Sequence, residues 1–255
     1  MARQAWSRQE EILVLDLYYR IPFKKSSKSH PEVIRIANII GRSPSAVNMK
    51  IGNFGHFDTS LKVENISGLI HTSKLDEKIW NEFYGHWDLL AQEAFEIFKI
   101  YGVNEKIIED IDSDVFDRKG KDITITTTSR INQAFFRNAV LAAYNDACCI
   151  TGLSTKSLLR ASHIKPWKDS TDEEKTDPRN GLCLNALLDA AFDKGLMTVN
   201  LDGRVHFSNY ISDMCNGETV DRFFKKYEDC KIIAADRFQP LKEYIEYHND
   251  VIFER

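Results

Sequence analysis

The sequence contains no uninterrupted run of about 18 apolar residues, the minimum for a membrane-spanning helix, although 43% of its residues are hydrophobic. Its first residues, MARQAWSRQEE, also lack the apolar core of a signal peptide. We therefore expect a protein that works in the cytoplasm without a membrane.

Cysteine is scarce, and the five residues present are an odd number. Without a secretory signal, reduced thiols are favoured over disulfides. No pair of cysteines has the CxxC spacing of a zinc-binding loop, because Gly152 and Ala186 stand three residues after Cys149 and Cys183. We predict no structural zinc, and we expect these two thiols to act as small buried hydrophobes.

Positive charge is in slight deficit, with a net charge of −4, but its distribution is uneven. Residues 1–56 have a balance of +5, whereas residues 57–128 have a balance of −7. A locally basic segment favours contact with phosphate groups, so DNA binding is expected at the N-terminal end.

The N-terminal segment predicts three helices. Ser7 and Glu10 form a capping box before an amphipathic helix over 11–20, which stops at Pro22. A second helix over 31–40 ends at Gly41, and a third over 45–54 follows Ser43 and Pro44. The short Gly-Arg-Ser connection is typical of a helix-turn-helix.

On the third helix, the spacing directs Val47, Ile51 and Phe54 inward. Asn can pair with adenine, and basic groups suit phosphate. The residues expected to contact DNA are Ser45, Asn48 and Asn53, which point outward with Met49, and Arg42 and Lys50 at the edge. The alternative is a three-helix bundle used for protein contacts or rigidity.

Residues 74–84 and 87–101 predict two further helices whose apolar stripes favour core or dimer contacts. The acidic and polar stretch over 104–128 is typical of a linker. We place a domain boundary near residue 120, between a helical domain of residues 1–120 and a second domain of residues 121–255.

Residues suited to catalysis or metal binding follow a predicted helix over 129–147. His163 lies in a predicted strand over 157–164, and Asn180 with Gly181 opens a short strand over 182–184. Asp189 and Asp193 follow on one face of a helix. A lone His is usually structural, and two Asp are usually a solvated face. Asp189 and Asp193, however, interrupt a helix that is otherwise apolar. Their two negative charges repel each other unless a cation compensates.

The motifs RxxQxxFRxxVLxAY, CxITG, LxASHIKPW and NGLxLNxLxDxAFDxG occur in this order. Residues 129–255 resemble the HNH, or ββα-metal, nuclease subfamily found among proteins assigned as bacterial restriction endonucleases. The N-terminal half resembles, less distinctively, a helical module that precedes such domains. The resemblance implies an α+β protein with an N-terminal helix-turn-helix-like domain and a C-terminal HNH nuclease domain.

The resemblance also implies roles for the candidate residues. His163 would be the general base, and Asn180 would brace the loop that carries it. Asp189 and Asp193 would hold one cation, and carboxylates favour Mg²⁺ or Mn²⁺ over Zn²⁺. Many family members have Asp or His where this chain has Ser162, which makes Ser162 a doubtful ligand.

Arg160, one strand pleat from Ser162, is expected to face the scissile group. Lys165 is expected to contact phosphate, with surface solvation as the alternative. The expected product ends are a 5′ phosphate and a 3′ hydroxyl. The expected role is restriction of foreign double-stranded DNA by a homodimer. No modified-base pocket is recognisable in the sequence, which favours ordinary sequence recognition and a companion methyltransferase. The alternatives are a modification-dependent or nicking nuclease and a DNA-binding regulator with an inactive HNH fold.

Overall fold

The computed structural model describes residues 5–64, 66, 68–103, 123–211 and 217–254. It divides into two compact units, Met1–Ala142 and Ala143–Arg255, which we call the N-terminal and C-terminal units. The predicted boundary near residue 120 lies outside the described residues. The combination of helices with small sheets confirms the predicted α+β class.

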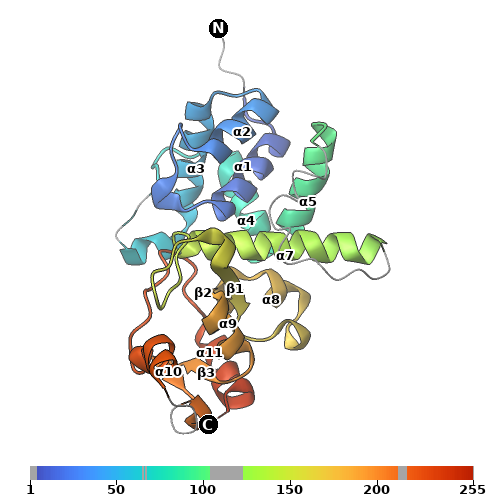
Figure 1. Ribbon diagram of the computed structural model, residues 1–255. Helices are drawn as coiled ribbons and strands as arrows, with labels where there is room; N and C mark the ends of the chain where they lie inside the picture. Colours follow the sequence, from blue (N-terminus) through green and yellow to red (C-terminus); the bar gives the residue numbers. More distant parts are fainter. Residues whose placement is uncertain (1–4, 65, 67, 104–122, 212–216, 255) are drawn as a thin grey trace. The chain divides into compact units, whose positions relative to one another are not determined.

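The N-terminal unit is helical (Figure 1). Its α-helices are α1 (Arg8–Arg20), α2 (Pro31–Ile40), α3 (Pro44–Phe57), α4 (Lys74–Phe83), α5 (Trp87–Ile100) and α7 (Ile123–Ala143), and its 3-10 helices are η1 (Phe23–Lys25) and η2 (Thr59–Glu64). The predicted capping box of Ser7 and Glu10 starts α1. Gly41 ends α2 in the left-handed conformation, with φ 68°, that glycine adopts without strain. The five predicted helices before residue 101 are therefore confirmed.

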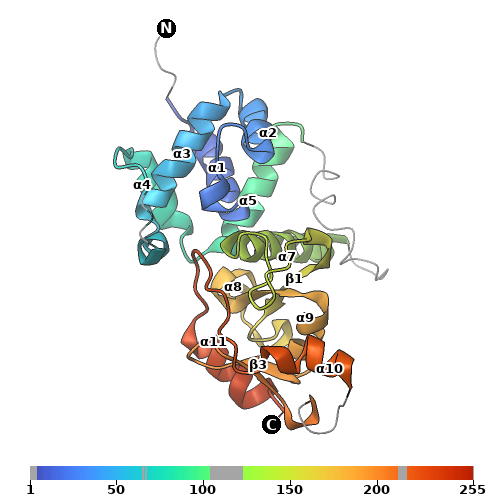
Figure 2. The same ribbon diagram turned by 60° about the vertical axis from the view of Figure 1, so that its left-hand side comes forward.

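Helix α1 is the centre of this unit and packs against α2, α3, α4 and α5 (Figures 1 and 2). Every residue from Glu10 to Tyr19 is buried. The predicted amphipathic helix therefore exposes little of its polar face, because neighbouring helices cover α1. Two of its charged residues pair with each other, since the Asp16 carboxylate accepts from Arg20 at 2.8 Å.

The C-terminal unit contains two small antiparallel sheets. Its strands are β1 (Leu159–His163), β2 (Gly181–Asn185), β3 (Met197–Val199) and β4 (Val205–Phe207), and its α-helices are α8 (Asp172–Thr176), α9 (Ala186–Asp193), α10 (Glu218–Phe223) and α11 (Lys242–Tyr247). Its short 3-10 helices are η3 (Lys156–Leu158), η4 (Trp167–Asp169), η5 (Pro178–Asn180) and η7 (Lys225–Tyr227), and η8 (His248–Ile252) is a π-helix. Strands β1 and β2 pair with His163 opposite Gly181 and Ser162 opposite Leu182.

Helix α9 packs against β1, β2 and β3, so these elements form the predicted strand, strand and helix arrangement. Asn185 begins α9, because its side chain accepts hydrogen bonds from the backbone NH groups of Leu187 and Leu188. Helix α7 ends at Ala143 instead of the predicted residue 147. Asn145 and Asp146 follow with positive φ angles, which a helix does not allow.

The C-terminal segment supports the end of α9. The ring of His248 stacks on Phe192 at 3.8 Å between ring centroids, and its Nε2 lies 3.2 Å from the Phe192 carbonyl oxygen. The carbonyl of Gly195 accepts a hydrogen bond from the Glu254 amide at 2.9 Å. A Cβ at Gly195 would lie 2.1 Å from the Ile252 carbonyl oxygen, so this close approach requires glycine.

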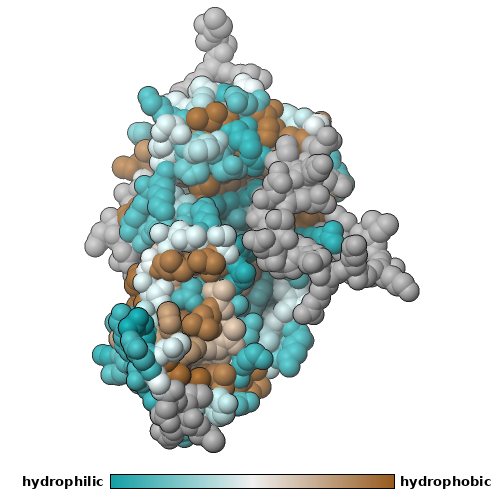
Figure 3. All heavy atoms as spheres, viewed as in Figure 1, coloured by the Kyte–Doolittle hydropathy of each residue, from teal (hydrophilic) through white to brown (hydrophobic). Residues whose placement is uncertain are grey.

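The surface mixes hydrophilic and hydrophobic side chains, and Figure 3 shows both kinds interspersed on one face. No helix among the described residues is long and apolar enough to cross a membrane.

Candidate active site

The candidate ligands meet where α9 lies against β1. Ser162, on β1, is 2% exposed, and its hydroxyl donates a hydrogen bond to the Asp189 carboxylate on α9. Asp193 follows one helical turn later on the same face. The structure therefore brings Ser162 and Asp189 together, although Ser162 was the most doubtful of the predicted ligands.

The pKa of the Asp193 carboxyl is raised, in part by the negative charge of Asp189. Desolvation of its carboxyl, together with the charge of Asp189, raises the pKa of Asp193 to about 6. Two carboxylates held in this way repel each other, and a cation between them would remove the repulsion.

His163 ends β1 directly after Ser162. Its Nε2 lies 3.1 Å from the Lys175 carbonyl oxygen. A carbonyl oxygen only accepts, so Nε2 carries the proton and the basic lone pair is on Nδ1. Burial lowers the pKa of His163 to about 4, against the opposing effect of this hydrogen bond. The imidazole is therefore neutral at pH 7, the form that a general base requires.

Asn180 closes the loop between β1 and β2. Its side chain is fully buried, and its Oδ1 accepts a hydrogen bond from the Lys165 amide at 2.8 Å. Its Nδ2 donates to the carbonyl oxygens of Lys165 and Glu174, at 3.2 and 3.1 Å, and lies 3.4 Å from Ser170 Oγ. One amide group thus joins both ends of the loop, which is a geometry suited to the bracing role that the resemblance implies.

The loop contains a helix that the sequence reasoning missed. Thr171 and Glu174 form a capping box that starts α8, and this helix delivers the Lys175 carbonyl to His163. The Thr-x-x-Glu pattern was present in the sequence and could have revealed it.

The two basic residues predicted near the motif have protein partners. Lys165 forms an ion pair with Glu174 at 2.7 Å, and Arg160 donates to the carbonyl oxygens of Ser157 and Leu159 at 3.1 and 2.9 Å. Contact of either residue with DNA stays a prediction.

The donor set fits a hard divalent cation. Among the described residues, no group of three or more His, Cys, Asp and Glu side chains could hold a metal ion. Two carboxylates and one hydroxyl nevertheless offer oxygen donors only, and Mg²⁺ is commonly held by one or two carboxylates with substrate phosphate and water. Two aspartates are thus enough protein ligands for a cation whose other ligands are water and substrate phosphate.

Residues 148–200 match the family model of an HNH endonuclease. The match lies within the C-terminal unit and includes all five residues discussed above: Ser162, His163, Asn180, Asp189 and Asp193. It supports nuclease activity, and with it a DNA substrate and a divalent metal ion. No curated protein matches the chain.

The thiols near this site are small buried groups, as predicted for Cys149 and Cys183. Burial raises the pKa of the Cys149 thiol well above its ordinary value, which keeps the thiol protonated and unreactive. Cys215 lies outside the described residues.

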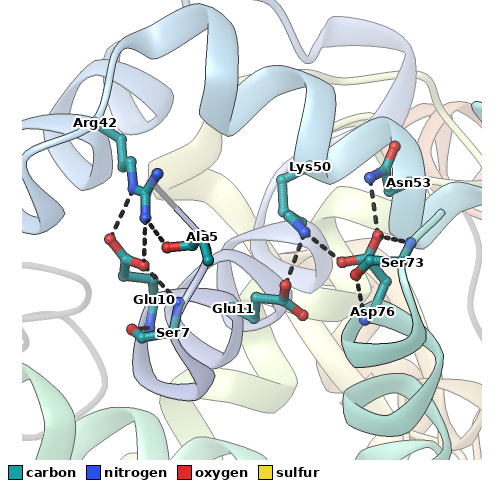
Figure 4. Close-up of polar contacts among 9 residues, drawn as sticks. All are labelled: Ala5, Ser7, Glu10, Glu11, Arg42, Lys50, Asn53, Ser73 and Asp76. Atoms are coloured by element: carbon teal, nitrogen blue, oxygen red, sulfur yellow. Dashed lines mark hydrogen bonds and ion pairs between the residues drawn. The ribbon is translucent and has the colours of Figure 1, made fainter. Parts of the chain in front are cut away.

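The predicted position of Lys50 at the edge of α3 was wrong. It does not lie at an edge: it is 4% exposed, and its ammonium pairs with Glu11 at 2.8 Å and with Asp76 (Figure 4). Asn53, expected outside, donates to Asp76 at 2.9 Å. Buried charges require such partners, so these side chains belong to an internal polar cluster.

Arg42 is also engaged within the unit, since its guanidinium pairs with Glu10 at 2.8 Å. Ser45 and Met49 are exposed, as expected, and Asn48 is half-buried. Val47, Ile51 and Phe54 are fully buried, which confirms the predicted inner face of α3. DNA contact by Ser45 and Asn48 stays a prediction.

Proposed function

We propose that the chain is a divalent-metal-dependent DNA endonuclease of the restriction type, with an N-terminal helical domain that reads DNA and a C-terminal catalytic domain. The observation that carries the proposal is the hydrogen bond from Ser162 to Asp189, because it sets a candidate metal ligand beside the strand residue that precedes His163.

In this proposal, His163 takes a proton from the attacking water at Nδ1, while Nε2 stays bonded to the Lys175 carbonyl. Asn180 fixes the loop that provides this carbonyl, through Lys165 and Glu174. Asp189 and Asp193 would hold the cation, which when bound neutralises charge on the scissile phosphate and the leaving oxygen.

Substitutions of the general base and of the cation ligands should affect cleavage for different reasons. Loss of His163 removes the proton acceptor but leaves the cation ligands in place. Loss of Asp189 removes both a ligand and the hydrogen-bond acceptor of Ser162. We propose further that one active site cuts one strand, that a homodimer cuts both, and that a companion methyltransferase protects host DNA.

The test is cleavage of a mixed pool of unmodified and cytosine-modified plasmids in Mg²⁺ or Mn²⁺, with and without EDTA. Discrete fragments are expected with wild-type protein and should be lost in His163→Ala. The matched control is His206→Ala, because His206 is a half-buried histidine on β4 that pairs with Glu228 outside the site. Intact DNA at every metal concentration, with binding preserved, would show that the chain binds DNA without cutting it.

A further inference from the structure

The indole of Trp167 lies against the imidazole of the candidate general base, His163. Trp167 begins η4, in the loop that follows β1. The two ring centroids are 5.5 Å apart and the ring planes meet at 85°, which is an edge-to-face contact. Aromatic pairs favour this arrangement at centroid distances of roughly 4.5–7 Å, so the two rings attract each other where they stand.

Lys175 contacts both of these rings. Its carbonyl oxygen lies 3.1 Å from His163 Nε2, and its ammonium lies over the Trp167 ring, 5.4 Å from the centroid. A cation at this distance is attracted by the negative face of an indole. Each of the three residues therefore contacts the other two, although they come from the end of β1, from η4 and from α8.

The backbone that carries the indole is held on both sides. Before it, Pro166 has the φ angle, −54°, that its ring imposes. After it, the Asp169 amide donates to the Pro166 carbonyl oxygen at 2.9 Å. Ser170 Oγ lies 3.0 Å from the carbonyl oxygens of Lys165 and Pro166. The half-buried Trp167 is thus placed by its own backbone as well as by the two side chains that it contacts.

A general base must keep the direction of its lone pair, and one hydrogen bond does not fix that direction. The hydrogen bond at Nε2 holds one end of the His163 imidazole, but χ2 of histidine has a broad potential, so the ring plane can turn about this bond. The Trp167 ring, at right angles to the imidazole, limits this turn. Misplacement of a reacting group by about 1 Å can lower a rate roughly 100-fold, so the ring plane matters for catalysis.

We propose that Trp167 is a positioning residue for the hydrolysis, and that it fixes the plane of the His163 imidazole so that Nδ1 keeps the direction in which it takes the proton from water. Trp167 acts through His163 and does not touch the reacting atoms. Lys175 in turn holds the indole in place. This inference rests on the proposed nuclease function and deepens it, since it names a further residue of the same site.

The first measurement is plasmid cleavage by the full chain in Mg²⁺, with enzyme in excess over DNA at several concentrations. It gives the maximal rate and the half-saturating enzyme concentration separately. Trp167→Leu should lower the maximal rate roughly 10- to 100-fold and leave the half-saturating concentration within about twofold, because only the direction of the base has changed. Trp167→Phe keeps an aromatic ring in the same place and should return the rate to within about threefold of wild type.

The second measurement is nuclear magnetic resonance of the full chain in EDTA, without DNA. A proton–nitrogen correlation spectrum of labelled histidine reports which ring nitrogen carries the proton. The signals of His163 are those that disappear in His163→Ala. The wild-type protein and Trp167→Phe should show one form of His163, with the proton on Nε2. Trp167→Leu should show exchange between the two neutral forms, because the ring no longer stays on the Lys175 carbonyl.

Lys175 provides a second variant that leaves the indole intact. Lys175→Met removes the ammonium over the ring and keeps the carbonyl that His163 needs, so the maximal rate should fall roughly two- to fivefold. Lys175 also pairs with Asp172 at 2.9 Å. The matched control is Asp172→Asn, which removes only this ion pair, at a side chain that is 83% exposed, and should change neither the rate nor the spectrum. Where Trp167→Leu fails to fold, the same two measurements on Lys175→Met decide.

Three results would overturn the inference: an unchanged His163 spectrum in Trp167→Leu, an unchanged maximal rate, or a loss of rate that Trp167→Phe does not restore. A raised half-saturating concentration with the maximal rate intact would also overturn it, because Trp167 would then be a DNA contact. Absence of cleavage by the wild-type protein would contradict the nuclease proposal instead. The spectrum would still show whether Trp167 fixes the ring, because it is recorded without metal or DNA.

Discussion

Divalent-metal binding should depend on pH through Asp193. The pKa of this carboxyl is raised to about 6, first by desolvation and then by the charge of Asp189. A metal ligand must be deprotonated to bind, so protons and the cation compete for the same group. With a pKa of about 6, the ionised fraction falls from roughly 90% at pH 7 to roughly 10% at pH 5.

The Kd for Mn²⁺ should therefore rise about tenfold between pH 7 and pH 5, since the affinity follows the ionised fraction. His163 does not contribute in this interval, because its pKa is lowered to about 4. The acidic limb of the cleavage profile near pH 6 should consequently come from a metal ligand, and the general base should stay neutral throughout it.

The assay is titration of the full chain with Mn²⁺, without DNA, following the free-ion signal by electron paramagnetic resonance at pH 7, 6 and 5. Asp193→Asn should weaken binding at pH 7 and remove most of the change with pH. Asp189→Asn should lower the pKa of Asp193, because it removes the second cause of the shift. The reasoning is refuted by a Kd that is the same at pH 7 and pH 5, or by a tenfold change that persists in Asp193→Asn.

Three further predictions concern stability, each measured as the free energy of unfolding in urea. Asn180→Ala should lower the free energy of unfolding by about 2–3 kcal/mol, because it leaves a buried amide and buried carbonyls without their partner. A loss below about 0.5 kcal/mol would contradict the role of Asn180 in joining the ends of the loop. Lys50→Met should cost about 3 kcal/mol or more, because two buried carboxylates lose their cation, whereas the exposed control Met49→Ala should be nearly neutral. The lowered pKa of His248, about 4 against 6.5, means that stability present above pH 6.5 is lost as the pH falls towards 4, by about 3 kcal/mol. His248→Gln should flatten this part of the pH profile, and an unchanged profile would assign the loss to other groups.

Local signals in the sequence predicted the elements well. Capping residues, the prolines at 31 and 44 and the glycine at 41 act within one helical turn, so they set helix ends without knowledge of the fold. The strand that carries His163, the strand that follows Asn180 and the helix that carries the two aspartates were found in the same way, and the ends of the two strands differ from those predicted by one or two residues.

The environment of charged side chains could not be predicted locally. Lys50 meets Glu11 and Asp76, which are 39 and 26 residues away in sequence. Helical spacing placed Lys50 at the edge of α3, but only the packing of α1 and α4 decides that this edge is interior. The partner of Ser162 was hidden for the same reason, because its hydroxyl meets Asp189 across 27 residues.

The support of α9 by the segment around His248 and Glu254 has a consequence for synthesis. The ribosome delivers His163, Asn180 and both aspartates before the residues that stack on Phe192 and bond Gly195. Until residues 244–254 emerge, the helix that carries the candidate ligands lacks one of its supports, whereas the N-terminal unit is already available to fold. If the proposed division of labour holds, a nascent chain acquires the unit proposed to bind DNA before the unit proposed to cut it.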